Sequence, residues 1–316
     1  MEAYAKKRKK PSGQLGMELK KDWKRNKVKY IMLIPVVIYF VLFSYKPMYG
    51  LIIAFKDFRP GLGIMDSPWV GLDNFEAFLK DVYFWRLLRN TLSISVLQII
   101  FGFPIPIIFA LFLNELKGQK FKKTVQTVSY LPHFISIVIV CGIVKVFVQS
   151  DGLLPSMMES AFGIQPTNWL TKKELFYPIY IISGIWQNMG WDSIIYLAAL
   201  AGIDQEQYEA AKIDGAGRFQ QMWYVTLPGI IPTVMIMFIL RMGTLLSVGY
   251  EKILLLYTPT TYEVADVIST YVYRRGLLEA DYSYSTAISM FNSIFNVIFL
   301  LATNKISKKM SGISLY

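Results

Sequence analysis

Residues 206–228 read EQYEAAKIDGAGRFQQMWYVTLP, a charged, helix-favouring segment that separates two apolar stretches. Ala210 and Ala211 are small enough to let a helix lie close to a partner protein, and Gly215 allows the chain to turn. Pro228 can occupy the first turn of the next helix. The segment is therefore predicted to be a docking element rather than an ordinary amphipathic loop helix.

The composition around this segment is that of a membrane protein. The chain has 316 residues, of which 54% are hydrophobic and only 17% are charged. A soluble domain of this length could not bury so much apolar surface. We therefore predict an all-α, multi-pass protein of the plasma membrane. A 20-residue window gives six transmembrane helices, near residues 30–54, 89–113, 125–148, 176–202, 227–250 and 284–303. Lys46-Pro47 predicts a kink in the first span.

Lysine and arginine placement predicts the orientation of these spans. Residues 1–29 contain 11 of them, including the run KKRKK, and 114–123 contain four. Residues 203–225 contain two and the tail after 303 contains three, whereas the opposite loops hold more acidic than basic residues. Positive charge marks the cytoplasmic side. Both termini and the docking segment are thus expected to be cytoplasmic, and the net charge of +11 needs no nucleic acid to explain it.

These predictions divide the chain into three parts. A basic cytoplasmic segment covers 1–29, a six-helix transmembrane domain covers 30–303 with the coupling loop at 203–228, and a cytoplasmic tail covers 304–316. The outer loops are 55–88, 149–175 and 251–283. The last of these is expected to form a short amphipathic helix, with one apolar face made of Val264, Val267, Ile268, Tyr271 and Val272.

Several classes of enzyme are excluded by missing motifs. The one cysteine, Cys141, cannot form a disulfide within the chain, and the one histidine, His133, leaves no metal cluster to build. Neither a phosphate-binding G-x-x-x-x-G-K-[ST] segment nor a Ser-His-Asp arrangement occurs in the sequence. No catalytic or metal-binding residue is expected, and any energy from ATP must come from a partner.

The spacing within 206–228 resembles a known motif. Glu209-Ala210-Ala211, three residues, Gly215, nine residues and then Val225-Thr226-Leu227-Pro228 is similar to the EAA loop of permease subunits in binding-protein-dependent ABC importers. The family prefers isoleucine where this chain has Val225. The resemblance implies that the loop docks into ATPase subunits, with the coupling residues Glu209, Ala210, Ala211, Asp214, Gly215, Leu227 and Pro228.

The resemblance covers nearly the whole chain. Four segments are similar to the branch of the family that imports oligosaccharides from complex polysaccharides. They are VGLDNF at 70–75, GWDSIIYLAALAGIDQEQYEAAKIDGA at 190–216, ILRMGTLLSVGYEKILLLYTP at 239–259 and ADVISTYVYRRGL at 265–277. The resemblance implies a type I importer fold in which two related six-helix subunits enclose the path. A heterodimer is expected, since sugar importers of this kind usually pair two chains, but the sequence leaves open whether the second permease is a different chain. The resemblance also implies two ATPase subunits, which bind ATP and Mg, and an extracytoplasmic sugar-binding protein. The chain itself needs no cofactor.

The fourth predicted span carries candidates for the sugar path. Aromatic rings beside amide or carboxylate groups suit sugars, and this span places Trp186, Gln187, Asn188, Trp191 and Asp192 within two turns. Polar groups at mid-membrane depth must face a partner or a wet cavity. Interhelical packing is the alternative role, evenly weighed for Asn188 and Asp192 and favoured for the tryptophans.

Arg241 is the candidate in the fifth span, together with Tyr250. Regular helices would place Arg241 about 21 Å above the inner boundary and Asp192 about 15 Å above it. Arg241 is expected to line the path and to contact sugar hydroxyls or a uronate carboxylate, with Asp192 as its resting partner or neighbour. A structural arginine at the subunit interface is equally compatible with the sequence. The sugar, its length and its charge stay open.

Three other classes of protein are weaker alternatives. A secondary transporter would explain the spans but not the EAA-like loop. A membrane enzyme lacks an acidic pair or metal motif in its loops. A regulatory or sensor protein would leave uptake normal after deletion. ATP-dependent uptake with a copurifying ATPase separates the first alternative from an importer.

Overall fold

The computed structural model describes residues 12–315 of the chain. The predicted N-terminal segment 1–29 therefore falls partly outside the described residues, because the KKRKK run lies in 1–11, and so does Tyr316 of the tail. Helices account for nearly all of the regular structure, and no β-strand occurs among residues 12–315. The prediction of an all-α protein is confirmed for this part of the chain.

Seventeen α-helices are joined by short turns in the described residues. They are α1 Ser12–Phe40, α2 Lys46–Met48, α3 Gly63–Asp66, α4 Asp73–Lys80, α5 Phe84–Leu97, α6 Pro104–Glu115, α7 Gln119–Tyr130, α8 Ile137–Val148, α9 Leu153–Phe162, α10 Lys173–Ala201, α11 Gln205–Ile213, α12 Arg218–Gln221, α13 Leu227–Met242, α14 Tyr250–Leu256, α15 Tyr262–Ala265, α16 Ile268–Tyr273 and α17 Tyr282–Ser311. π-helical turns cover Val41–Tyr45, Gln98–Gly102, Met222–Thr226 and Arg274–Leu278, and 3₁₀ turns cover Tyr49–Phe55, Leu131–Phe134, Trp169–Thr171 and Pro259–Thr261.

Five helical stretches in the described residues are long and apolar enough to cross a membrane. They are Asp22–Phe55, Phe84–Glu115, Ile137–Phe162, Arg218–Met242 and Tyr282–Ser311. The fourth predicted span, at 176–202, corresponds to α10, which has 29 residues but falls outside this group. Its middle carries Gln187, Asn188 and Asp192, which lower the hydropathy of any window that includes them.

Two predicted spans have different limits in the structure. The span predicted at 125–148 is interrupted, because Pro132 opens a 3₁₀ turn and the Ser136 hydroxyl caps the first turn of α8. The span predicted at 227–250 is helical from Arg218 and ends at Met242, with an irregular segment before α14. The helix starts earlier than predicted because a π-helical turn, Met222–Thr226, joins α12 to α13. In this turn the Leu227 N–H donates to the Met222 carbonyl, directly before Pro228.

Two smaller predictions can be compared with the backbone. A π-helical turn, Val41–Tyr45, directly precedes Lys46-Pro47, where the sequence predicts a kink. The single amphipathic helix predicted around 264–272 is divided into α15 and α16, since Asp266 and Val267 leave the helical conformation. Its apolar residues nevertheless point into the protein, and Val267, Ile268 and Tyr271 are buried.

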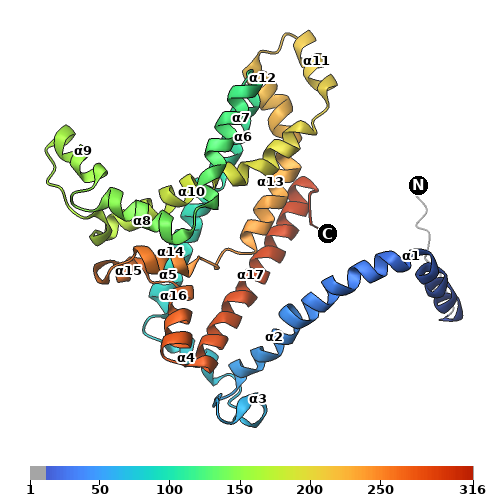
Figure 1. Ribbon diagram of the computed structural model, residues 1–316, viewed down its shortest axis with the longest axis vertical. Helices are drawn as coiled ribbons and strands as arrows, with labels where there is room; N and C mark the ends of the chain where they lie inside the picture. Colours follow the sequence, from blue (N-terminus) through green and yellow to red (C-terminus); the bar gives the residue numbers. More distant parts are fainter. Residues whose placement is uncertain (1–11, 316) are drawn as a thin grey trace.

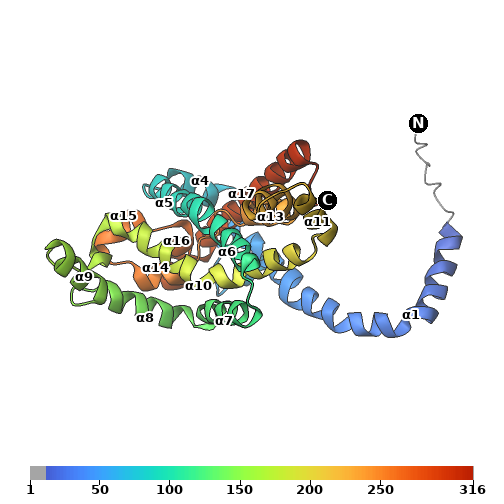
Figure 2. The same cartoon turned by 90° about the horizontal axis from the view of Figure 1, so that it is seen from above.

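Helix α10 lies at the centre of the helical assembly. It packs along α6, α7 and α13, while α13 also lies against α17 (Figures 1 and 2). Gly190 permits the closest of these approaches, since a Cβ atom there would lie 2.2 Å from the Ser129 carbonyl oxygen of α7. The backbones of α7 and α10 therefore touch at this glycine.

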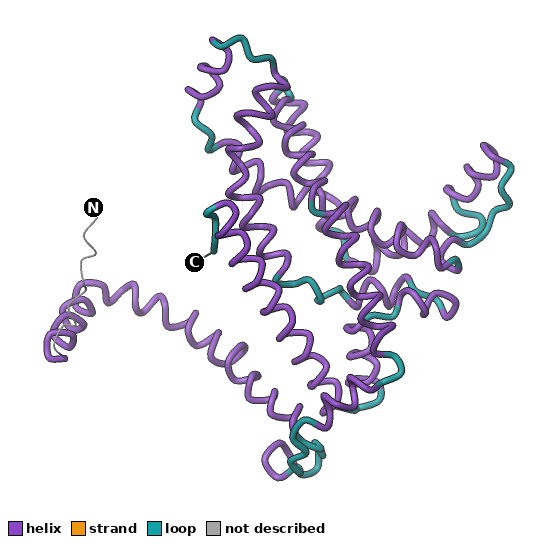
Figure 3. The backbone as a smooth tube through the Cα atoms, turned by 180° about the vertical axis from the view of Figure 1, so that it is seen from behind, coloured by secondary structure: helices purple, strands orange, loops and turns teal. Residues whose placement is uncertain are grey.

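The two ends of the molecule carry different elements. Helices α11 and α12 lie at one end and α3 and α4 at the other (Figure 1). Helix α1 diverges from the other helices in two views, and the apolar window of the stretch Asp22–Phe55 is 0% buried (Figures 1 and 3). The turn Tyr49–Phe55 at the end of this stretch packs against α17. Most of this apolar helix therefore lies away from the rest of the chain, and only its end is anchored to it.

Candidate functional site

The EAA-like segment forms a helix, a glycine turn and a second helix. The Asp204 side chain caps α11 by accepting the Glu206 N–H at 3.0 Å. Gly215 has a φ of +78°, a conformation that glycine adopts without the Cβ penalty. The Ala216 N–H donates back to the Ala211 carbonyl at 2.8 Å and so closes the end of α11. The turn expected at Gly215 is therefore present.

Most of the predicted coupling residues are open to a partner. Glu209, Ala210, Asp214, Gly215 and Pro228 are exposed, whereas Ala211 and Leu227 are half-buried. Apolar side chains add to this surface, since Ile213 is 86% exposed, and Phe219 stacks on Trp223 with ring centroids 6.3 Å apart. This end of the molecule thus presents small and apolar groups to solvent, a composition typical of an uncovered protein interface.

A hydrogen bond ties α11 to the base of α13. The Tyr208 hydroxyl lies 3.0 Å from Oγ1 of Thr226, and Thr226 is 1% exposed. Gln221 supports the same region, because its Nε2 donates to the Ala216 carbonyl at 2.7 Å. At the start of α13, a Cβ atom on Gly229 would lie 2.7 Å from Cδ1 of Ile203. The EAA-like segment and α13 are therefore held together by both polar and steric contacts.

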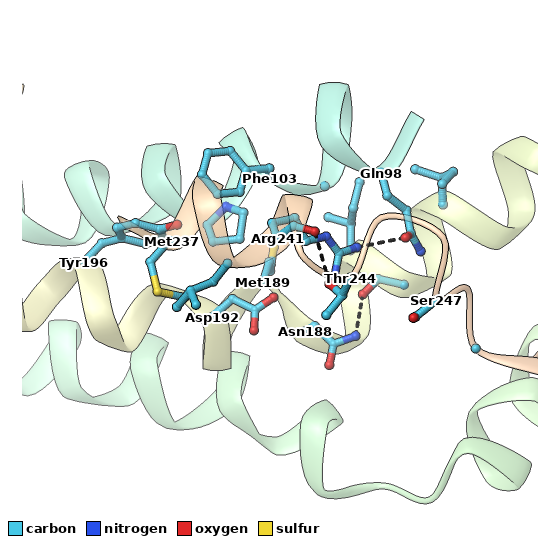
Figure 4. A pocket seen from close by; sticks show the side chains of 17 residues that line it. Gln98, Phe103, Asn188, Met189, Asp192, Tyr196, Met237, Arg241, Thr244 and Ser247 are labelled. Atoms are coloured by element: carbon cyan, nitrogen blue, oxygen red, sulfur yellow. Dashed lines mark hydrogen bonds between the residues drawn. The ribbon is translucent and has the colours of Figure 1, made fainter. Parts of the chain in front are cut away.

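Helix α13 ends at a cavity of about 550 Å³. The cavity wall comes from the α5–α6 junction, one face of α10, the end of α13 and the segment after it (Figure 4). Polar side chains gather there; they are Gln98, Asn188, Asp192, Tyr196, Arg241, Thr244 and Ser247. The shape and the mixture of amide, charged and aromatic groups suit a polar small molecule.

Arg241 is held in this cavity by a glutamine rather than by a carboxylate. Its Nη2 donates to Oε1 of Gln98 at 2.8 Å, and Gln98 begins the π-helical turn between α5 and α6 (Figure 4). Asp192 lines the same cavity, but no ion pair joins it to Arg241 in the described part of the chain. The structure thus places the two residues as neighbours on one cavity.

Asn188 is fixed by two hydrogen bonds. Its Nδ2 donates to the Gly184 carbonyl at 3.1 Å, and its Oδ1 lies 3.0 Å from Nδ1 of His133. The His133 ring also stacks on Trp191, with centroids 4.6 Å apart and an interplanar angle of 2°. The single histidine therefore orients a residue of the cavity wall.

The other predicted path residues lie elsewhere. Gln187 is buried and its Nε2 donates to the Ile135 carbonyl at 3.4 Å, and Trp191 packs on His133. Trp186 borders an apolar groove between α8 and α10. Tyr250 stacks on Tyr273 beside a separate cavity between α16 and α17. Only Asn188, Asp192 and Arg241 of the predicted set share the central cavity.

A buried ionic cluster joins α5 to the segment around α15 and α16. Asp266 is 2% exposed, and Nη2 atoms of Arg274 and Arg86 lie 2.8 and 3.5 Å from its Oδ2. Thr270 donates to its Oδ1 at 2.8 Å, and Asn90 donates to its backbone carbonyl at 2.9 Å. The hydrogen bonds to Asp266 fix the segment that follows α14, whereas Nε of Arg86 is buried without a hydrogen-bond partner.

A second cluster near the start of α5 centres on Asp81. The hydroxyls of Tyr271 and Tyr284 each donate to its Oδ2 at 2.6 Å. Burial alone would raise the pKa of this carboxyl, but the two tyrosine hydroxyls and the Tyr83 N–H hold the pKa below its ordinary value. Burial and the hydrogen bond to Asp81 raise the pKa of Tyr271 to about 12. Asp81 is therefore an ionised acceptor at neutral pH.

Three contacts of the site have no signal in the sequence: those of Arg241 with Gln98, Tyr208 with Thr226 and His133 with Asn188. Gln98 is 143 residues from Arg241, and no local signal in the sequence joins them. Tyr208 directly precedes the EAA-like motif and Thr226 lies near its end, and their spacing of 18 residues across a turn gives no periodic signal. His133 sits after a proline break, a position that predicts a helix start but not a contact with Asn188.

Comparisons with known proteins agree with this architecture. The family described as "Binding-protein-dependent transport system inner membrane component" matches residues 96–312. Protein LplB from Bacillus subtilis (strain 168) is 43% identical over 319 residues, covering 100% of both chains. The polygalacturonan/rhamnogalacturonan transport system permease protein YteP from the same strain is 44% identical over 292 residues, covering 92% of this chain and 91% of YteP.

A solved structure shares the fold over most of its length. The chain of a bacterial ABC transporter involved in the import of the acidic polysaccharide alginate has a TM-score of 0.85 and 45% sequence identity, covering 93% of this chain and 99% of that chain. The resemblance inferred from the EAA-like loop is thus confirmed, and so is the expectation of a transport subunit rather than an enzyme. This chain belongs to the family of inner membrane components of binding-protein-dependent transport systems, as a permease subunit of an ABC transporter.

Proposed function

We propose that this chain is one of two related permease subunits of an ATP-driven importer, and that it moves a polysaccharide-derived oligosaccharide into the cytoplasm. The names of two relatives support a sugar substrate, since one is a polygalacturonan/rhamnogalacturonan permease and another belongs to an alginate importer. The central cavity supports it independently, because amides, a carboxylate, a guanidinium and aromatic rings line it. In this proposal Arg241 leaves Gln98 to contact sugar hydroxyls or a uronate carboxylate.

The proposed topology has six crossings, with α10 as the fourth. At 29 residues, α10 is about 43 Å long as a regular helix, enough to span a bilayer. Its polar residues face the cavity or neighbouring helices, where they avoid lipid. Both termini, α11 and α12 lie on the cytoplasmic side in this scheme, and α3 and α4 lie outside.

The proposal also assigns partners. Two ATPase subunits, which bind ATP and Mg, dock on α11 and the exposed Ile213, Phe219 and Trp223. An extracytoplasmic sugar-binding protein docks at the opposite end; one similar solved transporter is in complex with a periplasmic protein bound to an alginate pentasaccharide. The second permease, a different chain in a heterodimer, and the lipid bilayer cover the remaining apolar surface, including α1.

One observation carries the mechanism. Helix α13 begins where Thr226 contacts Tyr208 of α11 and ends where Arg241 enters the cavity. Its 16 residues correspond to about 24 Å of regular helix. Movement of α11 as the ATPase subunits close would therefore move α13 and Arg241 together and alternate the access of the cavity.

Two substitutions in α11 and its turn test this role. Gly215→Leu forces a branched side chain into a left-handed conformation, a strain of about 1–2 kcal/mol, on the surface that the ATPase would contact. Glu209→Lys reverses an exposed charge there. Both variants should insert in the membrane and lose receptor-stimulated ATPase activity and ATP-dependent sugar uptake.

The matched control is Gly163→Leu. Gly163 has a φ of +66° and, like Gly215, no atom within 4 Å of its added Cβ, but it follows α9 rather than α11. It should therefore strain the backbone equally and leave coupling intact. Full stimulated ATPase activity and uptake in both α11 variants would show that this loop is not the coupling element.

A further inference from the structure

Lys252 in α14 is a buried cation without an ionic partner. It is 8% exposed and is flanked by Ile253, which is fully buried. Its Nζ donates to the Tyr180 carbonyl at 2.9 Å and lies 4.7 Å from the centroid of the Tyr180 ring. No carboxylate pairs with it in the described part of the chain. A single carbonyl thus accepts a hydrogen bond from this ammonium group, which has three N–H donors.

Packing alone gives no reason for a lysine here. Burying an unpaired ammonium is unfavourable, and an unbranched apolar side chain such as methionine would fill similar space without that penalty. The neighbouring residues of α14 that face the core are apolar, among them Ile253 and Leu256. A buried charge in a transport protein is therefore better explained by what the charge binds.

Gly184 connects Lys252 to the central cavity. This glycine of α10 forms part of the cavity wall, and a Cβ atom on it would lie 3.2 Å from Nζ of Lys252. The ammonium group therefore lies directly behind the wall at the position where α10 has no side chain. Asn188 lines the same face of α10 one turn further along, and Asp192 two turns further.

The charges around the cavity favour an anion. Arg241 lines it, Lys252 adjoins it at Gly184, and Asp192 is the one carboxylate among the described lining residues. Lys252 lies behind the wall rather than among the lining residues, and Arg241 is bound by a neutral glutamine rather than by Asp192. Neither cation pairs with a carboxylate in the described part of the chain, so each keeps its charge for a negatively charged ligand.

We propose that Lys252 is a specificity-determining residue for acidic oligosaccharides. Its ammonium group binds a carboxylate of a uronic acid residue through the gap that Gly184 leaves in the cavity wall, while Arg241 contacts a second part of the same chain. This inference rests on the proposed sugar path through the central cavity.

Direct binding tests the inference apart from transport. The assembled complex of permease and ATPase subunits is purified without its receptor, and Kd is measured for trigalacturonate and for its fully methyl-esterified, neutral counterpart. Lys252→Met should weaken binding of the acid trisaccharide about tenfold, as expected for loss of one charge-assisted hydrogen bond, and leave the ester unaffected. Lys252→Arg should retain most of the affinity.

Two further variants separate binding from folding. Gly184→Ala keeps the lysine but puts a methyl group 3.2 Å from its ammonium, so it should also weaken binding of the acid probe. If the Lys252→Met variant does not assemble, Gly184→Ala still tests whether Lys252 binds the acid probe. Lys145→Met, which removes an exposed lysine of α8, should leave both Kd values unchanged.

Three results would overturn the assignment. They are equal weakening of both probes by Lys252→Met, an unchanged Kd for trigalacturonate in Lys252→Met and Gly184→Ala, and no binding of trigalacturonate by the unsubstituted complex. ATP-dependent uptake of a neutral oligosaccharide would still support the proposed function in each case. Loss of ATP-dependent uptake altogether would refute the proposed function instead.

Discussion

The hydrogen bond between Tyr208 and Thr226 should carry part of the coupling between ATP hydrolysis and transport. Its oxygen atoms are 3.0 Å apart, and Thr226 is 1% exposed, so water cannot easily replace the lost partner. A neutral hydrogen bond of this kind contributes about 1 kcal/mol, which corresponds to about a fivefold change in an equilibrium. Tyr208→Phe and Thr226→Val each remove it with little change in side-chain volume.

The assay is the amount of sugar imported per ATP hydrolysed, measured in proteoliposomes that contain the complete transporter and its receptor. Tyr208→Phe should lower this ratio by up to about fivefold. Thr226→Val also removes the Thr226 hydrogen bond to the Gln221 carbonyl at 3.3 Å, so the double variant should be no worse than Thr226→Val alone. Tyr224→Phe is the matched control, since Tyr224 is 75% exposed. Additive losses in the double variant would refute the idea that this bond transmits movement to α13.

Three further predictions concern stability and assembly. Gly190→Ala would place its methyl carbon 2.2 Å from the Ser129 carbonyl oxygen, so size-exclusion chromatography should show loss of the assembled complex, whereas Gly142→Ala, with open space around it, should assemble normally. Asp266→Asn removes the carboxylate that pairs with Arg274 and Arg86; it should lower stability by about 2–3 kcal/mol, given the partial exposure of both arginines, and reduce the thermal midpoint of the complex, whereas Glu279→Gln at an exposed pair should have little effect. Because the folded-state pKa of Asp81 lies below its ordinary value of 3.8, its stabilising contribution is present above that value and is lost as the pH falls through the lowered pKa; Asp81→Asn should therefore weaken the acid dependence of the thermal midpoint, and an unchanged dependence would contradict this.

The EAA-like segment was the part of the structure that sequence could predict best. A helix-favouring run, a glycine and a proline each act through local backbone conformation, so Gly215 takes the left-handed conformation of a turn. Hydropathy likewise located the apolar helices, because it sums over many residues. It missed the break at residues 131–136, since a window of about 20 residues averages over one proline and one serine cap.

The cavity was only partly predictable. The cost of burying polar groups in a membrane singled out Asn188, Asp192 and Arg241, which the structure places around one cavity. The same reasoning could not find Gln98 as the partner of Arg241, since the two residues meet only through tertiary packing. Trp186 and Trp191 are residues of the kind that a sugar site contains, but they lie on other faces of α10. A cluster of residues within two turns of a helix does not by itself show which face each residue occupies.

Crosslinking from α11 is the most direct test that this helix docks on an ATPase subunit. After Cys141 is replaced by serine, Ile213→Cys and Val82→Cys place single thiols at positions that are both 86% exposed, one on α11 and one between α4 and α5. Inside-out vesicles carrying the complete transporter are treated with a short bifunctional thiol reagent. If α11 docks on an ATPase subunit, position 213 should crosslink to that subunit, with a yield that ATP changes, and position 82 should not. A crosslink from position 82 to the ATPase, with none from position 213, would contradict it.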